Sequence, residues 1–175
     1  MTDRPSKPVI GWREWVGLPD LGVEAVKAKV DTGARSSSLH AWDLDERQGP
    51  GGTVVLRFRI HPVQDDDDHI VEAEAPLVEH REVRSSNGER EWRPVITTTA
   101  VVLGRPFVLE LTLSRRDEMG FRMLLGRSAV RRRFLVDAGR SFLGGGSRVR
   151  PPTEAHPHRS PSSDVKHSVD VKHQR

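Results

Sequence analysis

The sequence predicts a mostly β domain, either a barrel or a sandwich, and two patterns carry this prediction. Apolar and polar residues alternate with period two in short runs that Gly, Pro, Asp or Asn separate. Segments with a helical period are almost absent, which disfavours a parallel α/β sheet because such a sheet needs crossover helices. We therefore expect short, mainly antiparallel strands in one domain over residues 9–143 of the 175.

Each expected strand has its own alternating run or its own β-branched residues. In chain order the expected strands are a first one containing Trp12 and Trp15, and then residues 26–30, 54–60, 71–75, 95–103 and 107–113. Gly104-Arg105-Pro106 is interpreted as the hairpin loop between the last two. A single short helix is expected over residues 128–134, with Ser128 as its N-cap.

Residues 144–175 have a different composition from the rest. They include Gly144-Gly145-Gly146, Pro151-Pro152, four of the eight His and few apolar side chains, so we expect a disordered basic tail. Residues 1–8 are expected to be a flexible N-terminus. The tail holds six of the 28 basic side chains and three of the 25 acidic ones, so the remainder is neutral. This balance argues against a domain that binds nucleic acid.

Composition also excludes several classes of protein. The chain contains no Cys, so it has no disulfide framework, no thiolate nucleophile and no Cys-based metal site. No apolar run reaches the length of a membrane span, and the first eight residues lack a signal-peptide core. We expect a soluble, cytoplasmic protein that does not bind a membrane.

The segment that begins at Asp31 carries the clearest chemical signal. The strand expected over residues 26–30 leads into Asp31-Thr32-Gly33-Ala34, a carboxylate followed by a hydroxyl residue and two small residues. Aspartic catalysis needs two carboxylates so close that one keeps a proton while the other polarises a water molecule for attack on a peptide carbonyl. In such a site Gly33 lets the backbone approach, and the Thr32 hydroxyl can hydrogen-bond across the pair.

Two further motifs follow in a fixed order. Residues 83–89 are followed by Arg93-Pro94-Val95-Ile96, and Leu124-Leu125-Gly126-Arg127 directly precedes the expected helix. With the Asp31 segment, they resemble a retropepsin, the aspartic peptidase with one lobe per chain. Over residues 9–143 the chain more closely resembles a bacterial retropepsin-like family, often labelled "ATP-dependent zinc protease", that is associated with ATP-grasp ligases modifying ribosomal proteins. The resemblance implies a closed acid-protease barrel in which Leu124, Leu125 and Gly126 pack beside the catalytic loop.

The resemblance implies a homodimer, and the count of carboxylates agrees with it. The sequence has one Asp-Thr-Gly and no Asp-Ser-Gly partner, whereas the mechanism requires two carboxylates. A two-fold axis between two copies of Asp31 would supply the second one. The monomer is then expected to be inactive.

Ser85-Ser86-Asn87-Gly88 is expected to be the turn of a hairpin, because Asn-Gly favours a turn that matches strand twist. We interpret this hairpin as a flap that closes over the cleft and contacts substrate. An exposed hairpin without such a role is the alternative.

The residues that follow the aspartate differ from those of the viral enzymes. In those enzymes, acidic residues at these positions bind substrate and pair with the Arg that follows the apolar-apolar-Gly segment. This chain has Arg35 and Ser36 there, so the partner of Arg127 is left open. A basic Arg35, with Arg84, Arg90 and Arg93 near the expected flap, favours an acidic peptide. Our hypothesis is a Glu-rich substrate, for example a glutamylated tail, bound by Ala34, Arg35, Ser36, Arg127 and the flap.

Other functions fit the residues less well. A zinc peptidase needs a ligand set such as His-Glu-x-x-His, which this sequence does not contain, and Asp65 to Asp68 before His69 is interpreted as a solvated turn. We therefore expect no metal and no cofactor. A dimeric barrel that binds a peptide or a ligase without catalysis is the main alternative to the enzyme.

Overall fold

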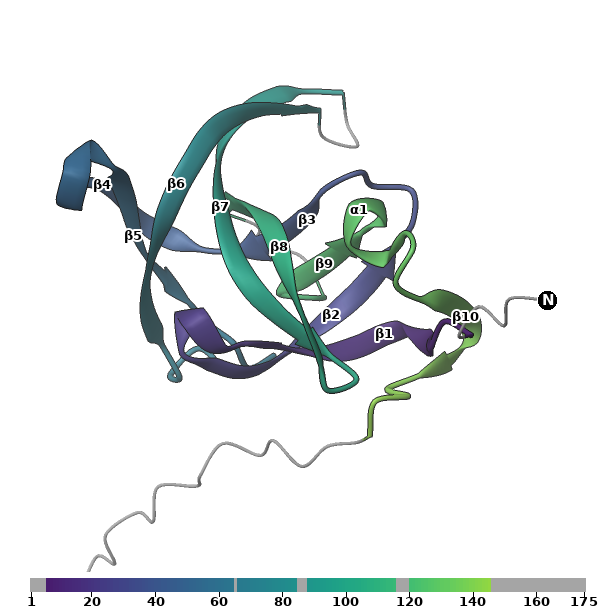
Figure 1. Ribbon diagram of the computed structural model, residues 1–175. Coiled ribbons are helices and arrows are strands. Elements are labelled where there is room, and N and C mark those ends of the chain that lie inside the picture. Colours follow the sequence, from purple (N-terminus) through teal and green to yellow (C-terminus); the bar gives the residue numbers. More distant parts are fainter. Residues whose placement is uncertain (1–5, 65, 85–87, 116–119, 146–175) are drawn as a thin grey trace, which may run out of the picture.

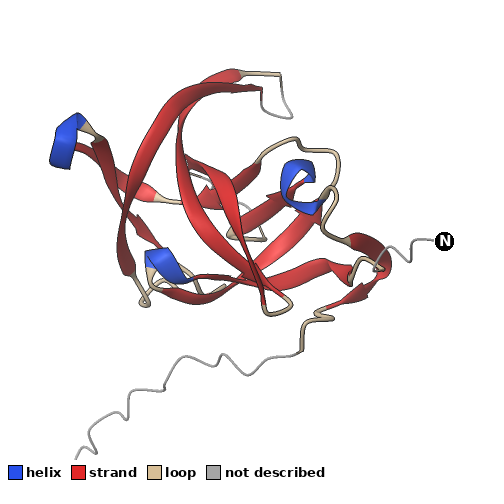
Figure 2. Cartoon of the chain, viewed as in Figure 1, coloured by secondary structure: helices blue, strands red, loops and turns tan. Residues whose placement is uncertain are grey.

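The computed structural model describes residues 6–64, 66–84, 88–115 and 120–145, and most of them lie in strands (Figures 1 and 2). The described residues also form three short helical segments. The elements in chain order are β1 (Val9–Leu18), η1 (Pro19–Leu21), β2 (Val23–Asp31), β3 (Ser37–His40), β4 (Trp42–Gln48), η2 (Pro50–Gly52), β5 (Val54–Ile60), β6 (Val71–Arg84), β7 (Arg90–Val102), β8 (Arg105–Ser114), β9 (Met123–Gly126), α1 (Arg127–Val130) and β10 (Leu135–Ser141).

Six strands close a barrel in the order β1-β2-β9-β3-β8-β7. The ring is completed where Gly17 of β1 pairs with Val101 of β7. Alternate residues of these strands face inward, so that side chains such as Ile10, Val26 and Leu111 are completely buried in the core. The prediction of a mostly β, closed barrel with one short α-helix is confirmed.

The expectation of mainly antiparallel neighbours needs one correction. β2 pairs with β9, β3 with β8, and β1 with β10 in parallel orientation. In the described parts of the chain no crossover helix joins these partners, because the chain between them passes through other strands of the same sheet. The absence of helical periodicity therefore did not exclude parallel pairs here.

β6 and β7 form a long hairpin that arches above α1 and the loop between β2 and β3 (Figure 1). Their pairing continues as far as Arg84 opposite Arg90. Gly88 has a φ of +89°, as expected of a turn residue, whereas Ser85, Ser86 and Asn87 lie outside the described residues. The side chain of Trp92 stands on this hairpin with 68% of its surface exposed.

Several local predictions were wrong in detail. The β7–β8 turn consists of Leu103 and Gly104, with φ values of +52° and +70°, and Arg105 already belongs to β8. The helix ends at Val130, and Ser128 does not cap it because the residue before the helix is Gly126. Strands β3, β4, β9 and β10 were not among the expected strands.

The end of the described chain is bound to β1. Glu14 is 1% exposed, and its carboxylate accepts hydrogen bonds from the N–H groups of Gly11 (2.7 Å), Leu143 (2.8 Å) and Gly144 (3.4 Å). The ring of Phe142 stacks on Trp15 with 5.4 Å between the ring centroids. Ordered contacts thus reach Gly144, and residues 146–175, the greater part of the expected tail, lie outside the described residues. In the described ranges no helix has the length and hydropathy of a membrane span.

Candidate active site

Asp31 is the last residue of β2 and begins a tight loop. Its Oδ1 atom accepts hydrogen bonds from the N–H groups of Gly33 and Ala34, each at 3.0 Å. Its Oδ2 atom makes no hydrogen bond with any residue that the structure describes. One carboxylate oxygen therefore holds the loop, and the other is available for a proton, a water molecule or a second carboxylate.

β9 and α1 support this loop from the neighbouring side. Asp31 is paired with Gly126 in the parallel β2–β9 ladder. The N–H groups of Arg127 and Ser128 donate to the carbonyl oxygens of Ala34 (2.8 Å) and Arg35 (3.1 Å). The first N–H groups of the helix are thus satisfied by the loop itself, which explains why the helix needs no Ser128 cap.

The sequence leaves the partner of Arg127 open, and the structure shows that its side chain binds main-chain oxygens. Its Nη1 atom donates to the main-chain oxygens of Thr32 at 2.9 Å and of Gly33 at 3.2 Å. No acidic residue is needed as its partner. Arg127 therefore ties the loop after Asp31 to the start of α1.

Gly126 and Ser37 form a second, buried connection. The N–H of Gly126 donates to the Ser37 hydroxyl at 3.0 Å, and the Thr112 hydroxyl donates to the Ser37 carbonyl at 3.1 Å. A Cβ atom at position 126 would lie 2.4 Å from the main-chain carbon and oxygen of Ser36, so only glycine fits. No sequence pattern signals the role of Ser37, because this residue stands within a run of three Ser and only its place in the fold distinguishes it.

The other predicted site residues lie as follows. Thr32, Gly33 and Arg35 are exposed, and Ala34 and Ser36 are half-buried. Leu125 is buried in the core, whereas Leu124 is buried on the opposite face of β9. The structure thus brings residues 31–36 and 124–127 together, and it describes Gly88 alone of the four predicted flap-turn residues.

The expectation that the arginines of the β6–β7 hairpin attract an acidic peptide needs a correction. Arg93 is 5% exposed and pairs with Glu91 at 2.7 Å, and Arg90 pairs with Glu82 at 3.2 Å. Their charges are thus matched within the hairpin. The argument for an acidic substrate then depends on Arg35 and Arg84, which are both exposed.

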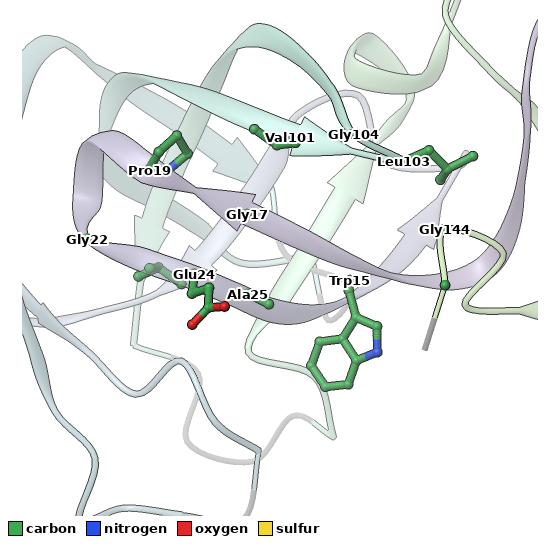
Figure 3. A pocket seen from close by; sticks show the side chains of 12 residues that line it. Trp15, Gly17, Pro19, Gly22, Glu24, Ala25, Val101, Leu103, Gly104 and Gly144 are labelled. Carbon is green, nitrogen blue, oxygen red and sulfur yellow. The ribbon is translucent and has the colours of Figure 1, made fainter. Parts of the chain in front are cut away.

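A cavity of about 600 Å³ lies elsewhere on the barrel (Figure 3). Trp15 and Glu24 extend from β1 and β2 on one side of it, and Leu103 lies on the other side. None of the residues from 31 to 36 lines it, so this cavity is not part of the candidate active site. Within the described ranges no three His, Asp or Glu side chains are arranged to hold a metal ion.

Comparison with known proteins identifies the family. The profile described as "RimB-like: Retropepsin-like aspartic endopeptidase RimB" matches residues 9–145. Two proteins named probable alpha-L-glutamate ligase, from Shewanella pealeana and Parasynechococcus marenigrum, are each 44% identical over 78% and 75% of this chain. The chain spans only 30% and 28% of the lengths of these two relatives.

A solved structure supports the same assignment of the fold. The crystal structure of a Legionella pneumophila protein of unknown function (DUF785) matches with a TM-score of 0.68 and 26% identity, over 80% of this chain and 100% of the other. The family profile covers well over half of the sequence and includes both segments that meet at Asp31. The chain therefore belongs to the RimB-like family of retropepsin-like aspartic endopeptidases.

Proposed function

We propose that the protein is an aspartic endopeptidase that hydrolyses peptide bonds with water activated by two Asp31 residues, one from each subunit of a homodimer. The observation that supports this most directly is the geometry of Asp31, whose Oδ1 is held by two N–H groups while Oδ2 has no partner among the described residues. A carboxylate fixed in this way can share a proton with a second one across a symmetry axis.

The surroundings of Asp31 support a shared site. Thr32 and Gly33 are exposed, although Arg127 and the two strands hold their main chain in place. A rigid and exposed loop of this kind suits contact with the same loop of a second subunit, because a two-fold interface brings identical residues together. In the dimer the Thr32 hydroxyls would brace the pair, Gly33 would allow close approach, and the β6–β7 hairpin would close over the peptide.

The substrate class we propose is an acidic, Glu-rich peptide, for example a glutamylated tail. Arg35 follows the catalytic loop directly and is exposed, so its guanidinium can meet a carboxylate of the substrate. The relatives named glutamate ligase contain a segment similar to this chain, which favours a functional link between the peptidase and an ATP-grasp ligase. We propose the cytoplasm as the compartment of both.

The decisive experiment compares wild type with Asp31→Asn and Asp31→Ala on a peptide library that includes Glu-rich peptides, from acidic to neutral pH. Asp31→Asn is the sharper variant, because its side-chain oxygen can still accept from Gly33 and Ala34 while the catalytic charge is lost. We expect both variants to lose all cleavage and a chelator to change nothing. Cleavage that survives both substitutions, or that a chelator abolishes, would contradict the aspartic mechanism.

A second assay tests the substrate class. Arg35→Glu should weaken cleavage of acidic peptides by about tenfold or more relative to neutral ones, and an equal loss on both would contradict a charge-based preference. Sedimentation of wild type shows whether the chain is a dimer. A folded wild-type dimer that binds peptides and cleaves none of them would favour the alternative, a barrel that binds a peptide or a ligase without catalysis.

A further inference from the structure

We propose that a polar pocket remote from Asp31 binds a small oxygen anion, either a carboxylate or a phosphate. The pocket has a volume of about 480 Å³ and is lined by His40, Trp42, His61, Asp67, Arg115 and Arg122. Arg122 directly precedes β9, whereas Gly126, the neighbour of Asp31, ends it, so the two places are roughly 13 Å apart along the strand. The pocket therefore makes no use of the catalytic loop.

His40 and Arg122 line the pocket, and Ser114, the last residue of β8, lies beside His40. His40 is paired with Ser114 in the β3–β8 ladder, and the N–H of His40 donates to the carbonyl of Arg122 at 2.8 Å. Residues side by side on neighbouring strands point to the same face of a sheet. Ser114 and His40 are each 4% exposed, and the Arg122 side chain is 12% exposed.

Two buried atoms of these residues lack the partners that buried polar atoms normally have. Within the described ranges, Arg122 Nε and Ser114 Oγ are buried and make no hydrogen bond. An arginine Nε can only donate, so the unpaired Nε of Arg122, a residue that lines the pocket, suits an acceptor. An oxygen anion is the ligand that satisfies such donors best.

The walls provide positive charge and a flat surface. Arg115 is exposed at the rim and adds a second guanidinium to that of Arg122. The rings of His40, Trp42 and His61 lie in a row, with centroid distances of 5.8 Å and 4.0 Å and interplanar angles of 29° and 22°. This row fixes the two His rings and makes one side of the pocket rigid before any ligand arrives.

Two neighbouring aspartates of the described chain are engaged in contacts of their own. Among the described residues, Asp67 is the one acidic residue that lines the pocket, and it binds Arg122 Nη2 at 2.7 Å, so that the adjacent Nε has no partner of its own. Asp66 accepts from the N–H groups of Asp68 and His69, so it stabilises its own loop. The Asp67 contact also holds the guanidinium in one orientation before a ligand binds.

The test is an NMR titration of the ¹⁵N-labelled full chain with inorganic phosphate and, separately, with sodium acetate at constant ionic strength. We expect saturable shifts of the Arg122 Nε–H and Trp42 indole signals, assigned with Arg122→Gln and Trp42→Phe. Shifts with phosphate alone identify a phosphate site, shifts with acetate alone a carboxylate site, and shifts with both a general oxygen-anion site. Signals that do not move with either probe would overturn the proposal.

A second variant, Arg115→Gln, should fold like wild type because Arg115 is exposed, so a loss of binding cannot be attributed to unfolding. We expect it to weaken anion binding at least fivefold, whereas Arg131→Gln, at an exposed arginine that follows α1 and does not line the pocket, should leave it unchanged. Asp31→Asn should also leave it unchanged. Equal binding by wild type and Arg115→Gln, or equal weakening by Arg115→Gln and Arg131→Gln, would show that the shifts are nonspecific and would contradict the proposal.

Discussion

Arg127 Nη1 donates to the main-chain oxygen of Thr32 at 2.9 Å, across a sequence separation of 95 residues. Because Arg127 also reaches the carbonyl of Gly33, one side chain holds the loop that presents Asp31.

Removing this side chain should loosen the loop without unfolding the barrel. For Arg127→Met we expect a loss of about 1 kcal/mol of stability, since the contacts are exposed, and about a tenfold lower kcat/KM on the best peptide substrate. Arg131→Met, four residues further along, is the matched control and should resemble wild type. Full activity of Arg127→Met would show that the loop holds its shape without the guanidinium.

Gly126→Ala should disturb the site through a steric clash. The added Cβ would lie 2.4 Å from the main chain of Ser36, and both segments are held by buried hydrogen bonds, so we expect a loss of about 3 kcal/mol in urea unfolding. Gly139→Ala is the control, because its Cβ would meet Asp137 Oδ1 at an ordinary 3.4 Å. Equal unfolding midpoints for the two variants would mean that the Ser36 segment can move away freely.

Glu14→Gln should weaken the attachment of the C-terminal segment. The carboxylate accepts from three main-chain N–H groups, and the amide would turn an N–H₂ group toward at least one of them. We expect a loss of about 2–4 kcal/mol in urea unfolding and faster amide exchange at Leu143. Glu24→Gln, an exposed change on the neighbouring strand, should stay within about 0.5 kcal/mol of wild type. A Glu14→Gln protein as stable as wild type would contradict a role for this carboxylate.

Asp20 should make stability depend on pH in the acid range. Hydrogen bonds from the Thr99 side chain and main chain lower the pKa of Asp20 below its ordinary value of 3.8. The folded state therefore binds this proton less readily than the unfolded state, so the stabilisation is complete above about pH 5 and declines as the pH falls through the lowered pKa. In thermal unfolding the difference between wild type and Asp20→Asn should shrink from pH 6 to pH 2.5. A difference that is constant over this range would contradict the assignment.

Trp92 tests the β6–β7 hairpin as a flap. Since 68% of its surface is exposed, Trp92→Ala should change stability by no more than about 0.5 kcal/mol. If the hairpin closes over peptide, the same change should raise KM severalfold. Val108→Ala, at a residue that is 67% exposed on β8, is the matched control. An unchanged KM for Trp92→Ala would favour a hairpin without a binding role.

The strands that the sequence predicted are those with one buried and one exposed face. The run from Val54 to Ile60 was predicted with its observed bounds, because alternation reports half-burial directly. β3 was missed because all four of its residues are buried, and β4 was missed because nearly all of its residues are exposed. Neither pattern alternates, so only their pairing with neighbouring strands reveals them as strands.

The candidate site was predicted unevenly for a similar reason. The proximity of Asp31 and Gly126 was expected from two motifs, and the β2–β9 register places them opposite each other. The bonds of Arg127 to main-chain oxygens and the role of the Ser37 hydroxyl depend on how the loop folds back, which no residue pattern encodes. Arg93 shows the opposite case, since its charge suggested substrate contact and its burial beside Glu91 argues against it.

The parallel partners of β1 and β2 also determine when this protein can fold during synthesis. Val9 is paired with Leu135, and Ala28 with Met123, so the first two strands find these neighbours only after almost the whole domain has been made. Until then their apolar edges remain open while the ribosome extends the chain at about 5–20 residues per second. Several seconds of exposure follow, and pairing over such long sequence separations is expected to make folding slow.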